Sequence, residues 1–187
     1  MSALPKIGID IGSTAIKVVE MAPIGKDKWK LMTAASMPSP EGGLLGARAN
    51  LSYYSAAIAK IIKEAGVRSR QVVASLPEEQ VFSHVVEMPE MPDSEVEQAL
   101  QWQVDQYIPI PPDQAVWSHQ IIQKSANNGG VEVLLVAAAK TTIETYRQVL
   151  EQAGLEVLAL ETELMAVTRS VVDKNTPLLL VMDIGAK

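Results

Sequence analysis

The most informative segment of the sequence is Ile9-Asp10-Ile11-Gly12-Ser13-Thr14. It lies between two apolar segments that predict strands over Ile7–Ile11 and Ala15–Met21, so its small residues form a tight turn. Backbone N–H groups of such a turn can cradle a phosphate. Gly12 allows a close approach of the backbone, and the hydroxyls of Ser13 and Thr14 add donors.

Two charged side chains extend this candidate phosphate site. Asp10, at the end of the first strand, is placed to hold Mg²⁺, through waters because Mg²⁺ keeps much of its hydration shell. Lys17 follows seven residues later on the next strand, from where it can reach a phosphate as a point charge. The alternative for this segment in isolation is a plain hairpin whose Asp and Ser side chains only satisfy the turn.

A second Asp-x-Gly turn repeats the pattern near the other end of the chain. Met182-Asp183-Ile184-Gly185-Ala186 follows an apolar segment that predicts a strand over Leu178–Asp183. An internal repeat suggests two related halves that face one nucleotide. Asp10 and Asp183 would then converge on one cation.

Composition bounds the class of protein. The 187 residues are 48% hydrophobic and 20% charged, enough for a sizeable core. The absence of cysteine excludes disulfide frameworks, zinc ribbons and iron–sulfur clusters. The net charge of −6 argues against nucleic acid as a partner. Apolar stretches such as Val133–Ala139 fall far short of the ~18 residues of a membrane span, so we expect no direct membrane insertion.

The periodicity of apolar residues predicts a mixed α/β chain. The expected strands are Ile7–Ile11, Ala15–Met21, Trp29–Ser36, Val72–Ser75, Ser83–Met88, Val116–Gln123, Val131–Ala138, Glu156–Leu160 and Leu178–Asp183. The expected helices are Ser52–Ala65, Ser94 to about Ile108, Thr141–Ala153 and Thr162–Asp173. The change of pattern indicates a small inserted α+β subdomain over residues 81–160, within an α/β domain formed by residues 1–80 and 161–187.

The two turns resemble those of the actin-like ATPase superfamily, which includes actin, DnaK-type chaperones, sugar kinases and the FtsA and PilM families. Its phosphate-1 and phosphate-2 turns match Asp10–Thr14 and Asp183–Ala186. The resemblance implies an actin-like (ribonuclease-H-like) subdomain 1A with an inserted subdomain 1C, the second lobe being absent. It implies ATP and Mg²⁺ as cofactors of the full-length protein. The implied nucleotide-binding residues are Asp10, Gly12, Ser13, Thr14, Lys17, Asp183 and Gly185. Of these, Asp10 and Asp183 would also bind Mg²⁺.

The superfamily also has a helix between the two turns, often opening with an acidic residue near the attacking water. Glu161–Ala166 matches this place, with Glu163 as the candidate catalytic residue and Glu161 as its rival. The alternative is that both carboxylates only favour the positive end of the helix dipole. The resemblance implies at most a slow ATPase, and this fragment alone is expected to be inactive.

A narrower resemblance is to the PilM family of type IV pilus assembly proteins. It rests on residues 7–20, Val85–Pro92, Glu95–Gln103 and Tyr107–Ile110. It implies a cytoplasmic protein held at the inner face of the cytoplasmic membrane through partners. Those partners are the N-terminal cytoplasmic peptide of PilN, in a groove between 1A and 1C, and other platform proteins and motor ATPases. The alternatives are a small-molecule kinase of the superfamily and an FtsA-like division protein.

Partner binding has its own candidate residues within the expected insert. Trp102 points away from the apolar stripe of its helix and is the candidate anchor, because Trp is enriched at interface hot spots. The alternative is that Trp102 packs on a neighbouring strand or loop. Residues 84–124 carry seven acidic and one basic side chain, which would attract a basic partner or simply form a solvated face.

Overall fold

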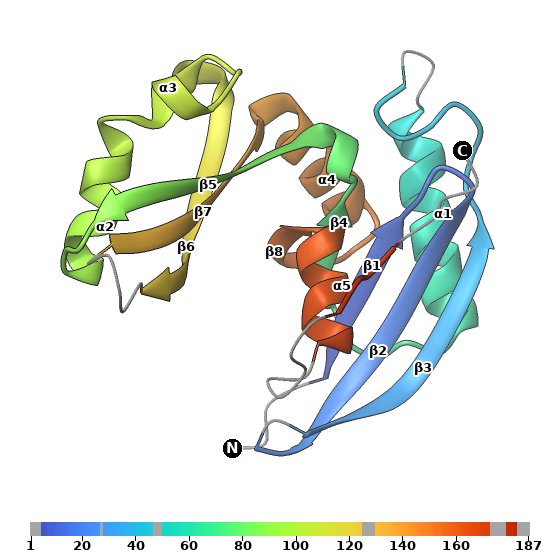
Figure 1. Ribbon diagram of the computed structural model, residues 1–187. Helices are drawn as coiled ribbons and strands as arrows, with labels where there is room; N and C mark the ends of the chain where they lie inside the picture. Colours follow the sequence, from blue (N-terminus) through green and yellow to red (C-terminus); the bar gives the residue numbers. More distant parts are fainter. Residues whose placement is uncertain (1–4, 27, 47–49, 125–129, 173–178, 183–187) are drawn as a thin grey trace. The chain divides into compact units, whose positions relative to one another are not determined.

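The computed structural model describes residues 5–26, 28–46, 50–124, 130–172 and 179–182. It divides into two units, Met1–Pro77 with Glu144–Lys187, and Glu78–Ile143 (Figure 1). The first unit contains β1 (Lys6–Ile11), β2 (Ala15–Gly25), β3 (Lys28–Pro38), α1 (Leu51–Glu64), β4 (Gln71–Leu76), most of α4 (Lys140–Gln152), β8 (Glu156–Thr162) and α5 (Glu163–Val171). The second contains β5 (Val81–Pro89), α2 (Asp93–Gln101), α3 (Val104–Tyr107), β6 (Ala115–Lys124), β7 (Gly130–Ala139) and two short 3₁₀ turns, Glu78–Gln80 and Pro112–Gln114.

The first unit is built on a five-stranded sheet in the order β3-β2-β1-β4-β8. The β1–β2 and β2–β3 pairs are antiparallel, whereas β1 pairs with β4 and β4 with β8 in parallel. Alternate residues of β1 and β4 are buried, so one face of the sheet carries the core. Figure 1 shows α1 running along the sheet. Parallel pairing aligns the carboxyl ends of β1, β4 and β8 at one edge.

The helix α1 forms as the sequence predicts. Its buried side chains follow the helical period, and Gly66 beyond its end adopts a φ of +68°, which favours glycine. At its start, the Asn50 side chain accepts a hydrogen bond from the Ser52 N–H, which caps the helix.

A buried carboxylate fastens β2 to the segment that leads into β4. Glu20 is only 4% exposed, yet its Oε1 accepts hydrogen bonds from the Arg68 N–H at 3.0 Å and the Ser69 N–H at 2.7 Å. A buried carboxylate is tolerated when such donors satisfy it. This link holds the start of β4 beside the meander.

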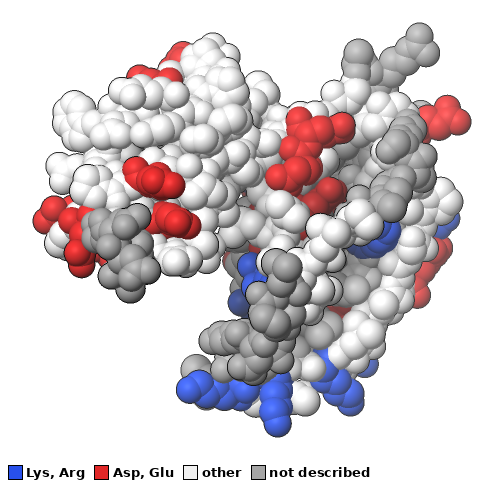
Figure 2. Space-filling view, viewed as in Figure 1, with Lys and Arg blue, Asp and Glu red and all other residues white. Residues whose placement is uncertain are grey.

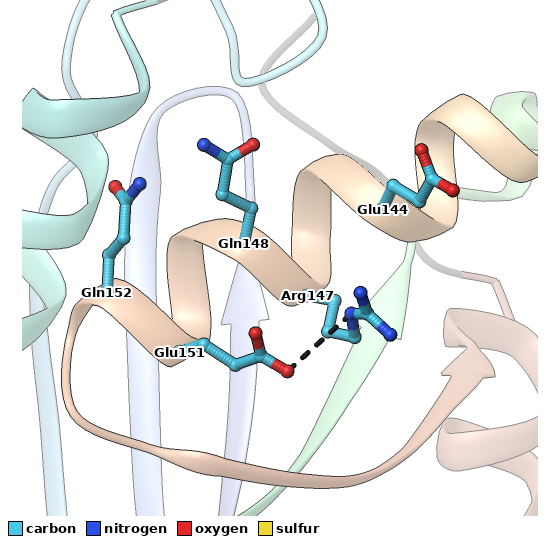
Figure 3. Close-up of a pocket in the computed structure, with 5 residues that line it drawn as sticks. All are labelled: Glu144, Arg147, Gln148, Glu151 and Gln152. Atoms are coloured by element: carbon cyan, nitrogen blue, oxygen red, sulfur yellow. Dashed lines mark ion pairs between the residues drawn. The ribbon is translucent and has the colours of Figure 1, made fainter.

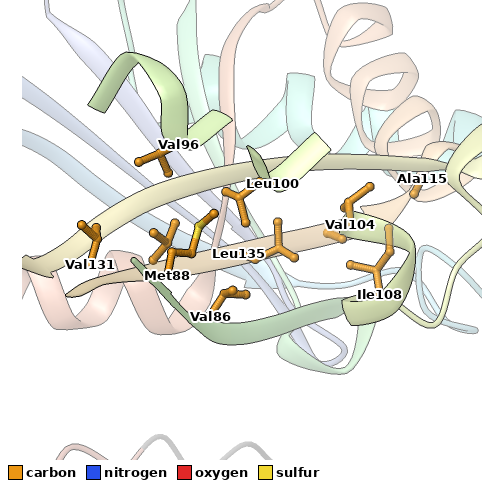
Figure 4. Packing of buried hydrophobic residues seen from close by; sticks show 11 residues of the cluster. Val86, Met88, Val96, Leu100, Val104, Ile108, Ala115, Val131 and Leu135 are labelled. Carbon is orange, nitrogen blue, oxygen red and sulfur yellow. The ribbon is translucent and has the colours of Figure 1, made fainter. Parts of the chain in front are cut away.

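The second unit has a smaller antiparallel sheet in the order β5-β7-β6, with a core of its own. The predicted strand pair β6–β7 is confirmed, with Val116 opposite Ala138. One face of the sheet packs against α2 and α3, and Figure 4 shows the interlocking side chains. The labelled members of this core are Val86, Met88, Val96, Leu100, Val104, Ile108, Ala115, Val131 and Leu135.

The prediction of one continuous helix from Ser94 to Ile108 is wrong. The helix begins at Asp93, with Pro92 at the N-cap position, and breaks after Gln101. The apolar stripe explains the break, because Val96 and Ile108 are three steps of four residues apart. On a helix of 3.6 residues per turn each such step drifts about 40°, so an unbroken helix would turn Ile108 roughly 120° away from Val96. Interrupting the helix lets both side chains reach the same core.

Two further expectations differ from the structure. β8 pairs with β4, so it and most of α4 fall with the first unit, and the insert ends near residue 143 rather than 160. The strand expected over Leu178–Asp183 is not formed at the described residues 179–182. Leu180 is 82% exposed, and no described strand pairs with this segment, so the backbone hydrogen bonds that define a strand are missing.

The packing of the second unit predicts how shortening a buried side chain changes the free energy of unfolding. Leu100→Ala removes a fully buried side chain and should lower the free energy of unfolding by about 2–5 kcal/mol. Leu164→Ala, at a position 53% exposed, should change it by less than about 0.5 kcal/mol. Chemical denaturation measures both, and an equal loss in the two variants would contradict the assigned packing.

Candidate functional site

The turn between β1 and β2 is closed by a short backbone hydrogen bond. The Gly12 N–H donates to the Ala15 carbonyl oxygen at 3.1 Å. A Cβ atom at Gly12 would lie 3.0 Å from that same oxygen, a distance that real Cβ contacts rarely show. The close approach of the backbone therefore favours glycine here, because any side chain would have to displace the Ala15 carbonyl oxygen.

A brace from the loop after β3 fixes the turn from outside. The Ser39 Oγ donates to the Gly12 carbonyl oxygen at 2.6 Å, and the Ser39 N–H donates to the Thr14 carbonyl oxygen at 3.0 Å. The buried Tyr54 hydroxyl on α1 donates to the Pro40 carbonyl oxygen at 2.8 Å. Burial raises the pKa of Tyr54, which keeps the hydroxyl protonated as a donor.

The top of the turn stays open. Ser13 and Thr14 are exposed, and among the described residues no backbone partner meets their N–H groups. A fixed turn with two exposed hydroxyls, whose N–H groups meet no backbone acceptor among the described residues, is an arrangement that favours an anion.

The sheet register sets three polar side chains in one row beside the turn. Asp10 lies opposite Ser75 across the β1–β4 pair, and Ser75 lies opposite Glu161 across the β4–β8 pair. The Ser75 Oγ lies 3.5 Å from Asp10 Oδ1, at the limit of a hydrogen bond. Residues paired across neighbouring strands share a face of the sheet. The carboxyl edge of the parallel strands therefore presents two carboxylates with a hydroxyl between them.

Lys17 enters this row from the antiparallel side. It lies opposite Asp10 across the β1–β2 pair, and its Nζ is 2.9 Å from Asp10 Oδ2. The Lys17 side chain is 64% exposed, so the pair contributes only about 0.2–1 kcal/mol to stability. The spacing of seven residues read from the sequence thus brings carboxylate and ammonium together.

The start of α5 follows directly on this row. Thr162 is its N-cap, with Oγ1 accepting a hydrogen bond from the Met165 N–H at 3.1 Å. Glu163 stands in the first helical turn, where the helix dipole favours a negative charge. Glu161, near the end of β8, forms an ion pair with Arg169 of α5. The row thus contains Glu161, and Glu163 lies two residues beyond it.

The structure brings together five of the predicted site residues, Asp10, Gly12, Ser13, Thr14 and Lys17, in or beside one turn. Asp183 and Gly185 lie outside the described residues, and the second turn with them.

Sequence reasoning missed Ser39 and Ser75. Ser39 directly follows β3, which runs two residues further than expected, to Pro38. The signal for Ser75 is a hydroxyl among apolar neighbours at the end of a strand parallel to β1.

The donor set fits a hydrated magnesium ion that is shared with phosphate. No group of three or more acidic or histidine side chains gathers within the described parts of the chain. Mg²⁺ usually takes one or two carboxylates and completes its shell with water and phosphate oxygens. Asp10, whose side chain is 30% exposed, supplies such a carboxylate beside the turn.

Trp102 is 81% exposed at the break between α2 and α3. The alternative that Trp102 packs on a neighbouring strand or loop is therefore wrong. Its role as an anchor for a partner stays a prediction.

A surface hollow elsewhere lacks the features of a site. Its lining comes from one polar face of α4, and Figure 3 shows the side chains pointing outward. Arg147 Nε and Glu151 Oε1 form an ion pair of 3.5 Å there, at the spacing of an ordinary helix-surface pair. The hollow is therefore part of the solvent-exposed face of α4.

Comparison with known proteins identifies the family. The sequence model described as "Type IV pilus assembly protein PilM" matches residues 8–187. The chain belongs to the PilM family. This assignment takes precedence over the small-molecule kinase and FtsA-like alternatives, and the expected resemblance is confirmed.

Two solved structures resemble the PilM-family chain. One is a PilM–PilN type IV pilus biogenesis complex, at 27% identity and a TM-score of 0.76, covering 89% of this chain and 49% of that chain. This chain thus spans about half the length of its solved relative. The other is the cytoplasmic domain of EpsL, an inner membrane component of the type II secretion system of Vibrio cholerae. At 13% identity, a TM-score of 0.56 and coverages of 87% and 59%, it shows a shared fold alone.

No helix in the described segments is long and apolar enough to cross a membrane.

The close approach at Gly12 predicts a penalty for any side chain there. Gly12→Ala should lower the free energy of unfolding by about 1–3 kcal/mol, because the Ala15 carbonyl or the Ser39 brace must shift. Ser13→Ala, at the exposed neighbouring position, should cost less than about 0.5 kcal/mol. Thermal and urea unfolding compare the two, and a neutral Gly12→Ala would show that the turn is looser than described.

Proposed function

We propose that this chain is the nucleotide-contacting and partner-binding half of a type IV pilus assembly adaptor, which binds ATP with Mg²⁺ in its full-length form. The observation that carries the proposal is the row of Asp10, Ser75 and Glu161 beside the braced turn at Gly12. In sheets of this kind ligands bind outside the carboxyl ends of parallel strands.

Each residue has a role that its place supports. The N–H groups and hydroxyls of Ser13 and Thr14, with the Lys17 ammonium, would hold the β- and γ-phosphates. Asp10, whose Oδ1 faces the Ser75 hydroxyl, would bind a water of the Mg²⁺ shell. Asp183 and Gly185 would complete the site from the second turn. Bound Mg²⁺ would neutralise phosphate charge.

Hydrolysis, where it occurs, should be slow and regulatory. Glu163 would orient water from the first turn of α5, and Glu161 is the alternative. The Glu161–Arg169 ion pair would fix the opening of this helix relative to the row.

Removing the Asp10 carboxylate tests the nucleotide proposal. In the full-length protein, Asp10→Ala should weaken Mg–ATP binding by more than roughly tenfold, because the phosphate charge loses its metal. Asp105→Ala removes an exposed carboxylate in the second unit and should leave the affinity unchanged. Titration calorimetry with and without Mg²⁺ measures both. Equal affinities in two folded variants would refute the role of Asp10.

The partner that fits the second unit is a short basic and apolar peptide of a PilN-like membrane protein. PilN stands beside PilM in the complex that this chain resembles. The second unit, Glu78–Ile143, has ten acidic and two basic residues, a net charge of −8, whereas the rest of the chain is close to neutral at +2. Charge of this density steers a basic peptide, and the exposed Trp102 offers an apolar anchor. Through this partner the protein would sit at the inner face of the cytoplasmic membrane, beside other platform proteins and motor ATPases.

A peptide titration tests this second proposal separately. A fluorescent PilN-like N-terminal peptide should bind saturably, and its affinity should fall as salt rises. Trp102→Ala should weaken binding by roughly tenfold, the size of a hot-spot residue, whereas Trp29→Ala should not. If the affinity changes neither with salt nor in Trp102→Ala, the peptide binds elsewhere on the protein.

A further inference from the structure

The amino-terminal end of the five-stranded sheet, opposite the candidate nucleotide edge, is basic. Here β1 and β4 begin and the β2–β3 hairpin turns. Six exposed basic residues belong to this basic end: Lys6, Lys26, Lys28, Lys30, Arg68 and Arg70. Figure 2 shows Lys and Arg side chains gathered over the part of the first unit that carries the hairpin end.

The same hairpin exposes large apolar side chains. Ile24 is 63% exposed, Trp29 47% and Leu31 55%, and Met32 is also open. Trp29 and Leu31 lie on one face of β3, because they are two residues apart, and they pair with Pro23 and Met21 of β2. Lys28 and Lys30 alternate with them on the other face. Apolar and basic groups therefore meet at one tip.

Protection of a sheet edge explains only part of this pattern. β3 is an edge strand, and lysines and bulges on an edge discourage pairing with another sheet. That purpose accounts for Lys28, Lys30 and the register shift beside Pro23. It gives no reason for Ile24, Trp29 and Leu31, which increase the tendency to associate.

We infer that the β2–β3 hairpin is a peripheral docking tip for the anionic surface of a membrane. Trp is favoured at the depth of lipid headgroups, and Lys can extend its ammonium from an apolar stem to a phosphate. If the hairpin meets the membrane with its turn foremost, Ile24 and Trp29 reach headgroup depth, with Lys26 and Lys28 beside them. The contact stays peripheral and requires no membrane-spanning segment.

The exposed apolar side chains distinguish a lipid surface from two other anionic partners. Nucleic acid would be met by the same lysines, but the aliphatic side chains of Ile24 and Leu31 have nothing to donate to a base edge. The acidic second unit of another copy of this chain is the remaining competitor, since its charge of −8 complements the basic end. The apolar groups favour lipid, which offers both a charged plane and an apolar layer beneath it.

Vesicle flotation tests the inference on the purified chain. It should bind vesicles of phosphatidylcholine that contain about a third phosphatidylglycerol, but not phosphatidylcholine alone, and binding should fall as salt rises. Lys28→Glu with Lys30→Glu should reduce partitioning by at least roughly tenfold, since each cation near the surface contributes about a fivefold factor. The control, Lys60→Glu with Arg147→Glu, makes the same change in net charge at exposed helix positions and should retain binding.

A second measurement reports depth. A Trp102→Phe and Trp117→Phe variant leaves Trp29 as the only tryptophan, because the chain contains three. Its emission should shift to the blue and resist acrylamide quenching when anionic vesicles are added. Trp29→Ser in the native background should weaken flotation, and Trp102→Ser should not.

Several outcomes would overturn the inference. These are equal binding to neutral and anionic vesicles, no flotation of a folded sample, equal loss of vesicle binding in the hairpin and control variants, and no blue shift in the emission of Trp29. Concentration-dependent self-association that Lys28→Glu with Lys30→Glu abolishes would assign the tip to a second copy. Equally tight binding to an oligonucleotide would assign it to nucleic acid.

Discussion

The parallel pairing of β1, β4 and β8 organises the candidate site and the path of the chain. It is a long-range constraint, because β4 and β8 are separated in sequence by the whole second unit and α4. Parallel strands need such crossovers, and here one crossover is itself a small α+β unit with its own core. The pairing places Asp10, Ser75 and Glu161 in one row, and it directs the chain from β8 straight into α5.

The same sheet separates two chemistries at its two ends. The carboxyl edge has carboxylates, a hydroxyl and the braced turn at Gly12, which together suit a phosphate with a hydrated cation. The amino edge has lysines and exposed apolar side chains on the β2–β3 hairpin. Because β1 and β2 run the length of the sheet, a nucleotide and a membrane surface would bind at opposite ends of the same sheet without competing for residues.

Local signals were sufficient for much of the fold and for most of the candidate site. The turn from Gly12 to Thr14 and the pairing of Asp10 with Lys17 follow from adjacent residues and strand alternation. Ser39 and Ser75 could not be found in this way, because their roles depend on strand length and on register between distant segments. The break after Gln101 depends on Val96 and Ile108 having to reach the same core, which the local sequence of the helix does not show.

In the proposed function, the row of Asp10, Ser75 and Glu161 faces a bound metal–nucleotide. Paramagnetic relaxation by Mn²⁺, substituted for Mg²⁺ with ATP on the isotopically labelled full-length protein, tests it most directly. We predict that broadening is strongest for the amide signals from Gly12 to Lys17 and at Ser75 and Glu161. Broadening centred on the second unit, or sharp signals around Gly12 when ATP saturates the protein, would show that the metal–nucleotide does not bind at this row.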